Sequence, residues 1–460
     1  MKKSLFILSI LLFVGCKFSE SETKRIKELN DVKNLFIINP SENEKKVIDE
    51  WVKVFSRNIS LTNEKKEVVD DLFISNSPTF YFEDTLPNKK SRSGETNKIR
   101  EVSYKIGEKK TMQDPFDNRY YTVSVVYEGE FCYLWVEDGI DTVELDLEEF
   151  AKKFDEIYKK QTNLSGSKFT GESVKDGLIF PNKKISIVLY DIKNQSYLGY
   201  FSSNNYSSGA QIEAIFTDIE SAFNEKKKSE VLSTICHEFS HLLTHVNKYL
   251  KKGLLYETWY TELLAMISED FFKDDLNVSI ENSSQARFFS FVNNGSYVYG
   301  FKNWQSDAYM ANSYANAYTF GAFLARNYGG AELFYEIFHN DYVNEESIVR
   351  AVNKVNKINI TFNDLLKEFC YILVNIDNSD KNLPSLNKSH SFKIGEFTYS
   401  LSDIGPDDLP EGLSYKVEYD TFDSVTNKYL GSYGFNYLRF DSATDVTVSL
   451  FNKDLILEWN

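Results

Sequence analysis

Two histidines and a glutamate stand close together in the segment His237-Glu238-Phe239-Ser240-His241. On a helix, side chains four positions apart leave the same face about one turn apart, so both imidazoles can reach one ion. Zn²⁺ accepts imidazole nitrogens at about 2.0–2.1 Å. Glu238 lies about 100° around the helix from His237, so its carboxylate can take a proton from a water at the open side of that ion. The spacing therefore predicts a site for metal-assisted hydrolysis.

The residues around this segment are mostly apolar, which predicts a buried helix rather than a surface helix. Ser229 stands where such a helix would begin and has a side chain suited to an N-cap. The chain has 5 histidines, and two of them occupy the two positions that a metal needs. Two buried imidazoles without partners would destabilise the fold, and a divalent cation gives them a partner. The alternative is a pair of core histidines that bond to backbone or water.

A catalytic zinc needs a third protein ligand and one position open to water. Glu262 is the best candidate, because it lies 21 positions after His241 in an apolar run where an unpartnered carboxylate would be costly. Glu257 and Glu269 are alternatives, the first expected as a helix cap and the second at a solvated helix end. His245 continues the four-residue spacing, but one further turn moves it about 6 Å along the axis. We therefore expect His245 outside the metal site, either beside a ligand or exposed.

Hydrolysis of an acyl group also needs a donor that stabilises the developing oxyanion. Tyr318, on a predicted helix from Ser313 to Arg326, is the residue that we assign to this role. Tyr314 on the same helix and His339 are the alternatives. With zinc held by the two histidines and Glu262, the expected catalytic residues are Glu238 as general base and Tyr318.

The segment from His237 to Leu243, followed by Trp259 to Ala265, resembles the hyicolysin-type family of bacterial zinc metallopeptidases. Flanking features extend the similarity over roughly residues 120–375. The resemblance implies a secreted neutral metalloendopeptidase with a His, His, Glu zinc site. It carries zinc binding onto His237, His241 and Glu262, and the role of base onto Glu238.

This sequence departs from the family pattern beside the third ligand. Thr261 and Leu263 stand where Asn and Gly usually flank that glutamate. Met266 stands where many related enzymes have a further acid that orients a zinc-bound histidine. These departures bear on the rate of turnover rather than on the metal site.

We expect an α+β protein, with a zincin-type metallopeptidase catalytic domain flanked by N-terminal and C-terminal β modules. β-branched and aromatic stretches on either side of Glu128-Gly129-Glu130 predict a hairpin, and residues 146–159, 184–190 and 214–217 predict a helix and two strands. The predicted divisions are a lipoprotein signal peptide at 1–15, a tether with short helices such as Lys46 to Phe55 at 16–76, an N-terminal β module at 77–145, the zinc metallopeptidase catalytic domain at 146–380 and a β-sandwich-like module at 381–460.

The N-terminus has the pattern of an export signal. Lys2 and Lys3 precede an apolar stretch, from residue 5 to 14, that is too short to span a bilayer and ends in Gly15-Cys16. This arrangement resembles the bacterial lipoprotein signal, in which the cysteine is lipidated, although Phe13 replaces the usual leucine. The alternative is an ordinary secretory signal. We expect an extracytoplasmic protein of the bacterial cell envelope, anchored in a membrane by lipid on Cys16.

The net charge limits the classes of molecule that the protein can bind, and the cysteine count bears on its disulfides. A net charge of −16 argues against nucleic acid, whose phosphates need a basic surface. The expected partners are a peptide or protein substrate and the membrane that receives the anchor, and the protein itself is expected to be a monomer.

Beyond Cys16, the odd set of Cys132, Cys236 and Cys370 is no disulfide framework, although one bridge between Cys132 and Cys370 is possible.

Two functions from different classes remain open. The first is an active zinc endopeptidase. The second is a surface-displayed binding or adhesion lipoprotein with a vestigial metallopeptidase fold, whose β modules would do the binding. The presence of Glu238 favours the enzyme, because loss of the base is the usual mark of a dead site.

Overall fold

The computed structural model describes residues 25–41, 46–47, 52–56, 100–101, 103–166, 178–179, 184–193, 197–203, 212–293, 295–305, 310–376, 380–405, 429–450 and 455–459. The helices are α1 (Leu147–Ser165), α2 (Ile219–Ala222), α3 (Lys228–Thr244), the π-helix η2 (His245–Leu250), α4 (Thr258–Phe272), α5 (Ala286–Asn293), α6 (Met310–Tyr328), α7 (Gly330–His339), α8 (Asn344–Asn356) and α9 (Phe362–Cys370), with 3-10 turns η3 (Ile280–Asn282) and η4 (Ser296–Val298). The strands are β1 (Arg25–Ile38), β2 (Lys46–Val47), β3 (Val52–Ser56), β4 (Arg100–Glu101), β5 (Lys109–Gln113), β6 (Tyr120–Glu128), β7 (Cys132–Glu137), β8 (Leu178–Ile179), β9 (Ile185–Tyr190), β10 (Gly199–Phe201), β11 (Ala214–Asp218), β12 (His390–Ile394), β13 (Phe397–Leu401), β14 (Tyr429–Leu430), β15 (Phe435–Leu450) and β16 (Ile456–Trp459).

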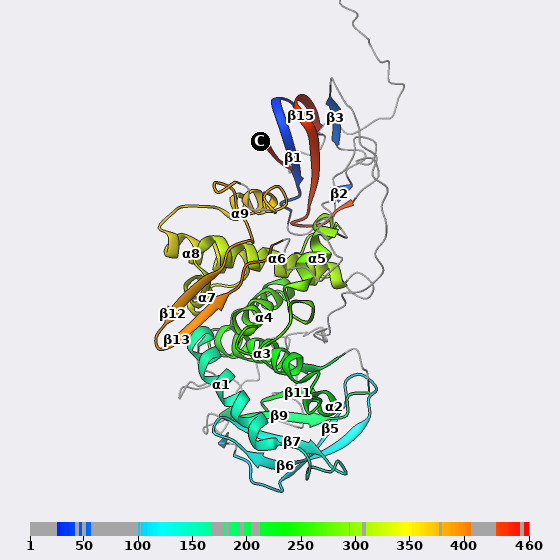
Figure 1. The fold of residues 1–460 in the computed structure, drawn as a ribbon, viewed down its shortest axis with the longest axis vertical. Coiled ribbons are helices and arrows are strands. Elements are labelled where there is room, and N and C mark those ends of the chain that lie inside the picture. The colour runs from blue at the N-terminus through cyan, green and yellow to red at the C-terminus, as the bar shows by residue number, and fades with distance from the viewer. Residues whose placement is uncertain are drawn as a thin grey trace, which may run out of the picture.

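A six-stranded sheet forms one end of the molecule, in the strand order β10-β11-β9-β7-β6-β5 (Figure 1). β6 and β7 pair antiparallel, which confirms the predicted hairpin. β9 pairs in parallel with both β7 and β11, and β10 closes one edge antiparallel to β11. The predicted strands at 184–190 and 214–217 are therefore confirmed, the first beginning one residue later, at Ile185.

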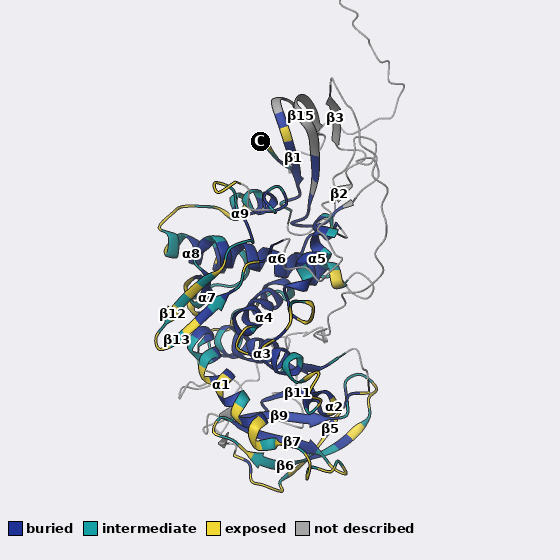
Figure 2. Cartoon of the chain, in the orientation of Figure 1, coloured by how far each residue is buried: buried dark blue, intermediate teal, exposed yellow. Residues whose placement is uncertain are grey.

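Alternating side chains of this sheet enter two different cores. Leu134 and Ile187 face the helices α1 and α3, whereas Trp135 and Val188 belong to a second, aromatic cluster on the opposite face. This division follows the two-residue period of a strand. Figure 2 shows the helices α3 and α4 almost entirely dark blue, the colour of buried residues. Asp146 caps α1 by accepting from the backbone N–H of Glu149, so the predicted helix is confirmed and extends to residue 165.

Helices α3, α4 and α6 stack one after another beyond the sheet (Figure 1). The contact between α4 and α6 is close because Gly321 has no side chain. A Cβ atom at Gly321 would lie 2.8 Å from Ile267 Cγ1 and 2.9 Å from Leu263 Cγ. Both neighbours are on α4, so this glycine allows α6 to support the helix that carries Glu262.

We expect the Gly321→Val substitution to lower the free energy of unfolding by about 1–3 kcal/mol, the range typical of overpacked cores. The added methyl groups must push α6 away from α4, because both close contacts are near branch points of buried side chains. Urea unfolding of the zinc-loaded protein measures the change. Ala311→Val, at an exposed position on α6, is the control. Equal stability of Gly321→Val and Ala311→Val would contradict the packing argument.

The two ends of the described chain form a common sheet, with strand order β16-β1-β15-β3. The prediction of a tether with short helices at 16–76 is therefore wrong for Arg25–Ile38, which is the strand β1 paired antiparallel with β15. The helical patch expected at Lys46 to Phe55 is also wrong for its described residues, because 46–47 lie in strand β2 and 52–55 lie in strand β3. Leu35 and Phe36 are fully buried, and Phe36 stacks on Tyr437 with ring centroids 4.8 Å apart.

The sheets do not follow the predicted domain divisions. The boundary predicted at 145 falls within one sheet, because β5, β6 and β7 pair with strands from the expected catalytic domain. The expected C-terminal module is divided as well. Its hairpin β12–β13 lies against the helices, where the Phe392 ring covers Gly330 and the Tyr399 hydroxyl donates to the Lys160 carbonyl, whereas β15 joins β1.

Three cysteines in the described ranges, Cys132, Cys236 and Cys370, are buried free thiols, so the possible bridge between Cys132 and Cys370 is not formed.

Over the described ranges, every helix is too short or too polar to cross a bilayer. The predicted signal peptide and Cys16 lie outside the described residues.

Candidate metal centre

The two histidines of the motif lie on α3, a helix whose residues from Val231 to Thr244 are all buried. α3 begins two residues earlier than predicted, with Lys227 in the N-cap position and no side-chain cap. The expected cap by Ser229 is therefore wrong. Burial against the sheet and α4, rather than a cap, stabilises this helix.

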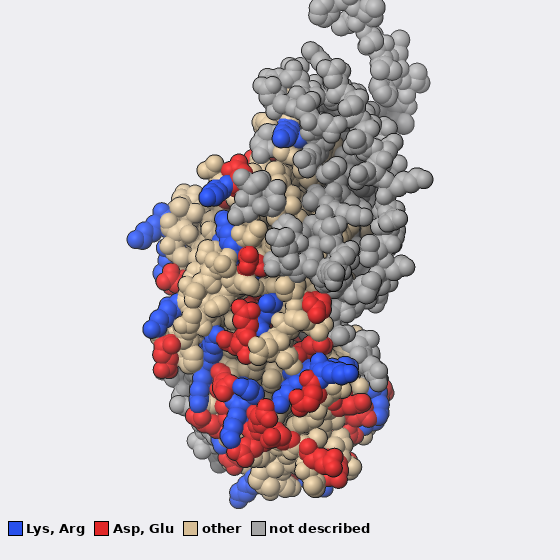
Figure 3. Space-filling view, viewed as in Figure 1, with Lys and Arg blue, Asp and Glu red and all other residues tan. Residues whose placement is uncertain are grey.

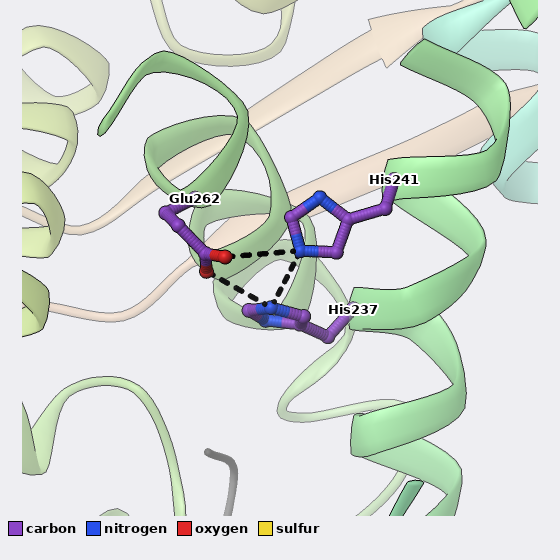
Figure 4. Close-up of side chains that lie close together, drawn as sticks. All are labelled: His237, His241 and Glu262. Carbon is purple, nitrogen blue, oxygen red and sulfur yellow. Dashed lines mark hydrogen bonds and ion pairs between the residues drawn. The ribbon is translucent and has the colours of Figure 1, made fainter. Parts of the chain in front are cut away.

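Helix α4 runs antiparallel to α3 and brings Glu262 to both histidines. Thr261 contacts His241 near one end of the contact, and Glu269 contacts His237 toward the other. Glu262 Oε2 lies 3.2 Å from His237 Nε2, and its Oε1 lies 3.4 Å from His241 Nε2. The two Nε2 atoms are 3.0 Å apart. Figure 4 shows the three side chains pointing toward one another from α3 and α4.

These separations fit a zinc ion. Tetrahedral ligands at about 2.0–2.1 Å from Zn²⁺ are about 3.3 Å from one another, and the three distances of 3.0, 3.2 and 3.4 Å lie close to that value. One ligand atom from each residue falls within 4.8 Å of the others. Two imidazoles and one carboxylate are also a donor set that zinc takes in catalytic sites. The residues therefore fit the predicted ion.

Electrostatics keep Glu262 charged in its buried position. Burial alone raises the pKa of Glu262, but the imidazoles of His241 and His237 lower it to about 2. Burial lowers the pKa of His237, whereas hydrogen bonds with Glu262 and Glu269 raise it to about 10. The carboxylate is thus ready to bind a cation, and a metal ion must displace a proton from His237.

Each histidine has a further partner on its other ring nitrogen. His237 Nδ1 lies 2.6 Å from Glu269 Oε1, and His241 Nδ1 lies 2.8 Å from Thr261 Oγ1. The expectation that Glu269 stands at a solvated helix end is wrong, because it is 4% exposed. α4 extends to Phe272, so Glu269 is inside the helix, two turns after Glu262. That two-turn spacing on an apolar helix is the signal that could have identified it.

Glu238 lies next to the ligands and is held by the edge of the sheet. The backbone N–H of Phe201, on β10, donates to Glu238 Oε2 at 2.8 Å. Burial raises the pKa of Glu238 to about 7. A carboxylate that gains and loses a proton near neutral pH suits a general base.

His245 is buried rather than exposed, and it lies outside the group of His237, His241 and Glu262. Its Nδ1 hydrogen-bonds with the Tyr256 hydroxyl at 3.0 Å. Burial lowers the pKa of His245 to about 3. The folded protein therefore holds this imidazole neutral at pH values where the unfolded chain protonates it.

We expect this histidine to make the protein less stable in mild acid. Below the ordinary histidine pKa of about 6.5, the unfolded chain binds one more proton than the folded chain, so stability falls as the pH drops toward 3. From pH 7 to pH 5 the loss is about 2 kcal/mol for this group. Urea unfolding at both pH values should show a loss smaller by about that amount in His245→Gln than in the wild type, because the other groups titrate in both. An equal loss of stability from pH 7 to pH 5 in the wild type and in His245→Gln would contradict this prediction.

The structure does not bring Tyr318 into the group of metal-ligand candidates. Its hydroxyl donates to Asp270 Oδ2 at 3.1 Å, and Asp270 also pairs with Arg326 at 2.9 Å, all three being buried. This geometry gives the oxyanion role of Tyr318 no support, and the role stays a prediction. His339, an alternative, stacks on Tyr335 at a centroid distance of 3.9 Å and is exposed.

Comparison with known proteins agrees with this geometry. A family model described as Peptidase M30 matches residues 117–403. The protein named neutral metalloprotease ShpI, from Staphylococcus hyicus, is 25% identical over 343 residues, which cover 66% of this chain and 73% of that protein.

A solved structure of a functionally unknown conserved protein from Bacillus anthracis str. Ames is 12% identical, with a TM-score of 0.34 and coverage of 58% of this chain and 53% of the other. The chain thus spans about half of the length of that protein. The family match covers more than half of the chain and includes every candidate ligand, so the chain belongs to the Peptidase M30 family, as its resemblance to hyicolysin-type enzymes predicted.

Proposed function

We propose that this protein is a zinc-dependent endopeptidase with a zincin-type catalytic domain, which hydrolyses peptide bonds of proteins outside the cytoplasm. One observation supports this most: His237, His241 and Glu262 converge within 4.8 Å, and Glu238 lies on α3 with the two histidines. Membership of a peptidase family and the similarity to a neutral metalloprotease support the reaction class.

In the proposed mechanism the chain's own residues hold and move protons. His237, His241 and Glu262 would hold the ion, which supplies Lewis-acid polarisation of the peptide carbonyl and activation of water. Glu238 takes a proton from that water and delivers it to the leaving amine nitrogen. The backbone N–H of Phe201 holds one Glu238 oxygen at 2.8 Å, so the carboxylate keeps its orientation during the transfer.

The proposal includes a place of action. The N-terminal pattern ending in Cys16 supports export and lipid anchoring in the cell envelope. All the candidate metal ligands come from one chain, which is consistent with a monomer. Acidic and basic side chains intermingle on the face shown in Figure 3, and the chain has a net charge of −16. These features favour a protein substrate over a polyanion.

Cleavage of casein by purified protein, with and without a chelator, tests the proposal. We expect one zinc per chain, cleavage within the casein chains, loss of cleavage after zinc removal and recovery when zinc is restored. The binding or adhesion alternative is not favoured, since the ligands and Glu238 are all present. One zinc per chain without any cleavage by the wild type would instead support that alternative.

A further inference from the structure

Glu269 lies against the side of His237 that faces away from Glu262. Its Oε1 lies 2.6 Å from His237 Nδ1, whereas Glu262 Oε2 is 3.2 Å from Nε2 of the same ring. The ring is fully buried, and Glu269 is 4% exposed. Ser233, one turn before His237, donates its hydroxyl to Glu269 Oε2 at 3.3 Å. Both carboxylate oxygens of Glu269 are therefore engaged on α3.

The spacing along α4 explains how one helix contacts both nitrogens of the ring. Glu262 and Glu269 are seven residues apart, which is two turns and about 10.5 Å of helix. Both carboxylates therefore leave the face of α4 that packs on α3. Met266, between them, has no acidic group. In this chain a carboxylate is present three residues later and reaches the ring.

The neighbouring acid has a different partner. Asp270 accepts from Arg326 and Tyr318 on α6 and from the side chain of Gln285, just before α5, so it joins α4 to α6 and to the segment that leads into α5. The last turn of α4 thus uses two consecutive acids for separate contacts. Asp270 stabilises the packing of helices, whereas Glu269 contacts a candidate ligand.

We propose that Glu269 is a positioning residue for the metal centre, which fixes His237 in the tautomer that presents Nε2 to the ion and strengthens that nitrogen as a donor. A carboxylate beside Nδ1 keeps the proton there, so the lone pair stays on Nε2. The inference rests on the proposed zinc site. The two histidines would then differ in donor strength. His237 Nδ1 has a carboxylate partner, whereas the partner of His241 Nδ1 is the uncharged hydroxyl of Thr261, at 2.8 Å.

The test measures zinc affinity, by competition with a chromophoric chelator, in the full-length protein. We expect Glu269→Gln and Glu269→Ala to bind zinc about 10–100-fold more weakly, the usual effect of removing such a partner. Thr261→Val, which removes the hydroxyl from the other histidine, should weaken binding less. The absorption spectrum of the Co²⁺-substituted protein should shift in Glu269→Gln, because the orientation of one ligand changes.

Glu269→Gln keeps the size of the side chain and an acceptor oxygen, so it addresses the charge even if Glu269→Ala does not fold. Folded Glu269→Gln with wild-type zinc affinity and an unchanged Co²⁺ spectrum would overturn the inference. These readouts do not depend on peptide cleavage. A wild type that binds zinc but cleaves no peptide would reject the proposed function, while the affinity of the variants would still decide the role of Glu269.

Discussion

Glu238→Gln should abolish most peptide hydrolysis while the protein keeps its zinc. The amide cannot take a proton from water, and loss of a general base typically slows a reaction by about 10²–10⁴-fold. The metal should stay, because Glu238 is not among the three residues that converge as candidate ligands. The fold should also persist, since the buried carboxylate has a pKa of about 7, raised by burial, and a neutral side chain is tolerated there.

The measurement is kcat for a fluorogenic peptide, combined with zinc content by atomic emission and with circular dichroism. Glu220→Gln, an exposed glutamate on α2, is the matched control and should keep full activity. If Glu238→Gln turned over substrate as fast as the wild type, another group would have to be the base. If it lost zinc as well as activity, Glu238 would have to be a ligand.

Glu262→Ala should remove the metal itself. The carboxylate contributes the only negative charge among the three candidate ligands, and its two oxygens lie 3.2 and 3.4 Å from the two imidazoles. Without it, two imidazoles remain, and zinc content after dialysis at neutral pH should fall from one per chain to near zero. Cleavage should disappear with the metal, because the mechanism needs both.

Glu257→Ala is the control, because the sequence also offered Glu257 as a ligand. In the structure Glu257 stands at the N-cap of α4, where its Oε2 accepts from Trp259 Nε1 and pairs with Lys302 Nζ. We expect this variant to keep zinc. Zinc loss in Glu257→Ala, with retention in Glu262→Ala, would reverse the assignment of the third ligand.

The convergence of His237, His241 and Glu262 could be predicted from the sequence because its constraints are local. The four-residue spacing of His237 and His241 needs only a helix, and an acid within the apolar helix that follows has few other ways to be satisfied. The same reasoning misplaced Glu269, because Asp270 beside it suggested a solvated end. The helix continues to Phe272, and Gln285 and Arg326, from later segments, contact the buried Asp270. Whether a helix end is covered depends on distant segments, which local patterns do not reveal.

The long-range pairing of β1 was hidden for a similar reason. Leu35 pairs with Leu438, about four hundred residues later, in the register of β1 and β15. The polar residues on either side suggested a tether, and nothing local indicates the partner strand. The domain boundary predicted at residue 145 is wrong for the same reason. β7 and β9 pair in parallel although α1 separates them in the sequence, and neither strand alone indicates this pairing.

A crystal structure of the zinc-loaded protein, with diffraction data collected at the zinc absorption edge, tests the metal site most directly. We predict one anomalous peak at about 2.0–2.2 Å from His237 Nε2, His241 Nε2 and a Glu262 carboxylate oxygen. A peak held by other residues, or no peak between α3 and α4 in a protein saturated with zinc, would contradict the assignment of this site as the catalytic centre.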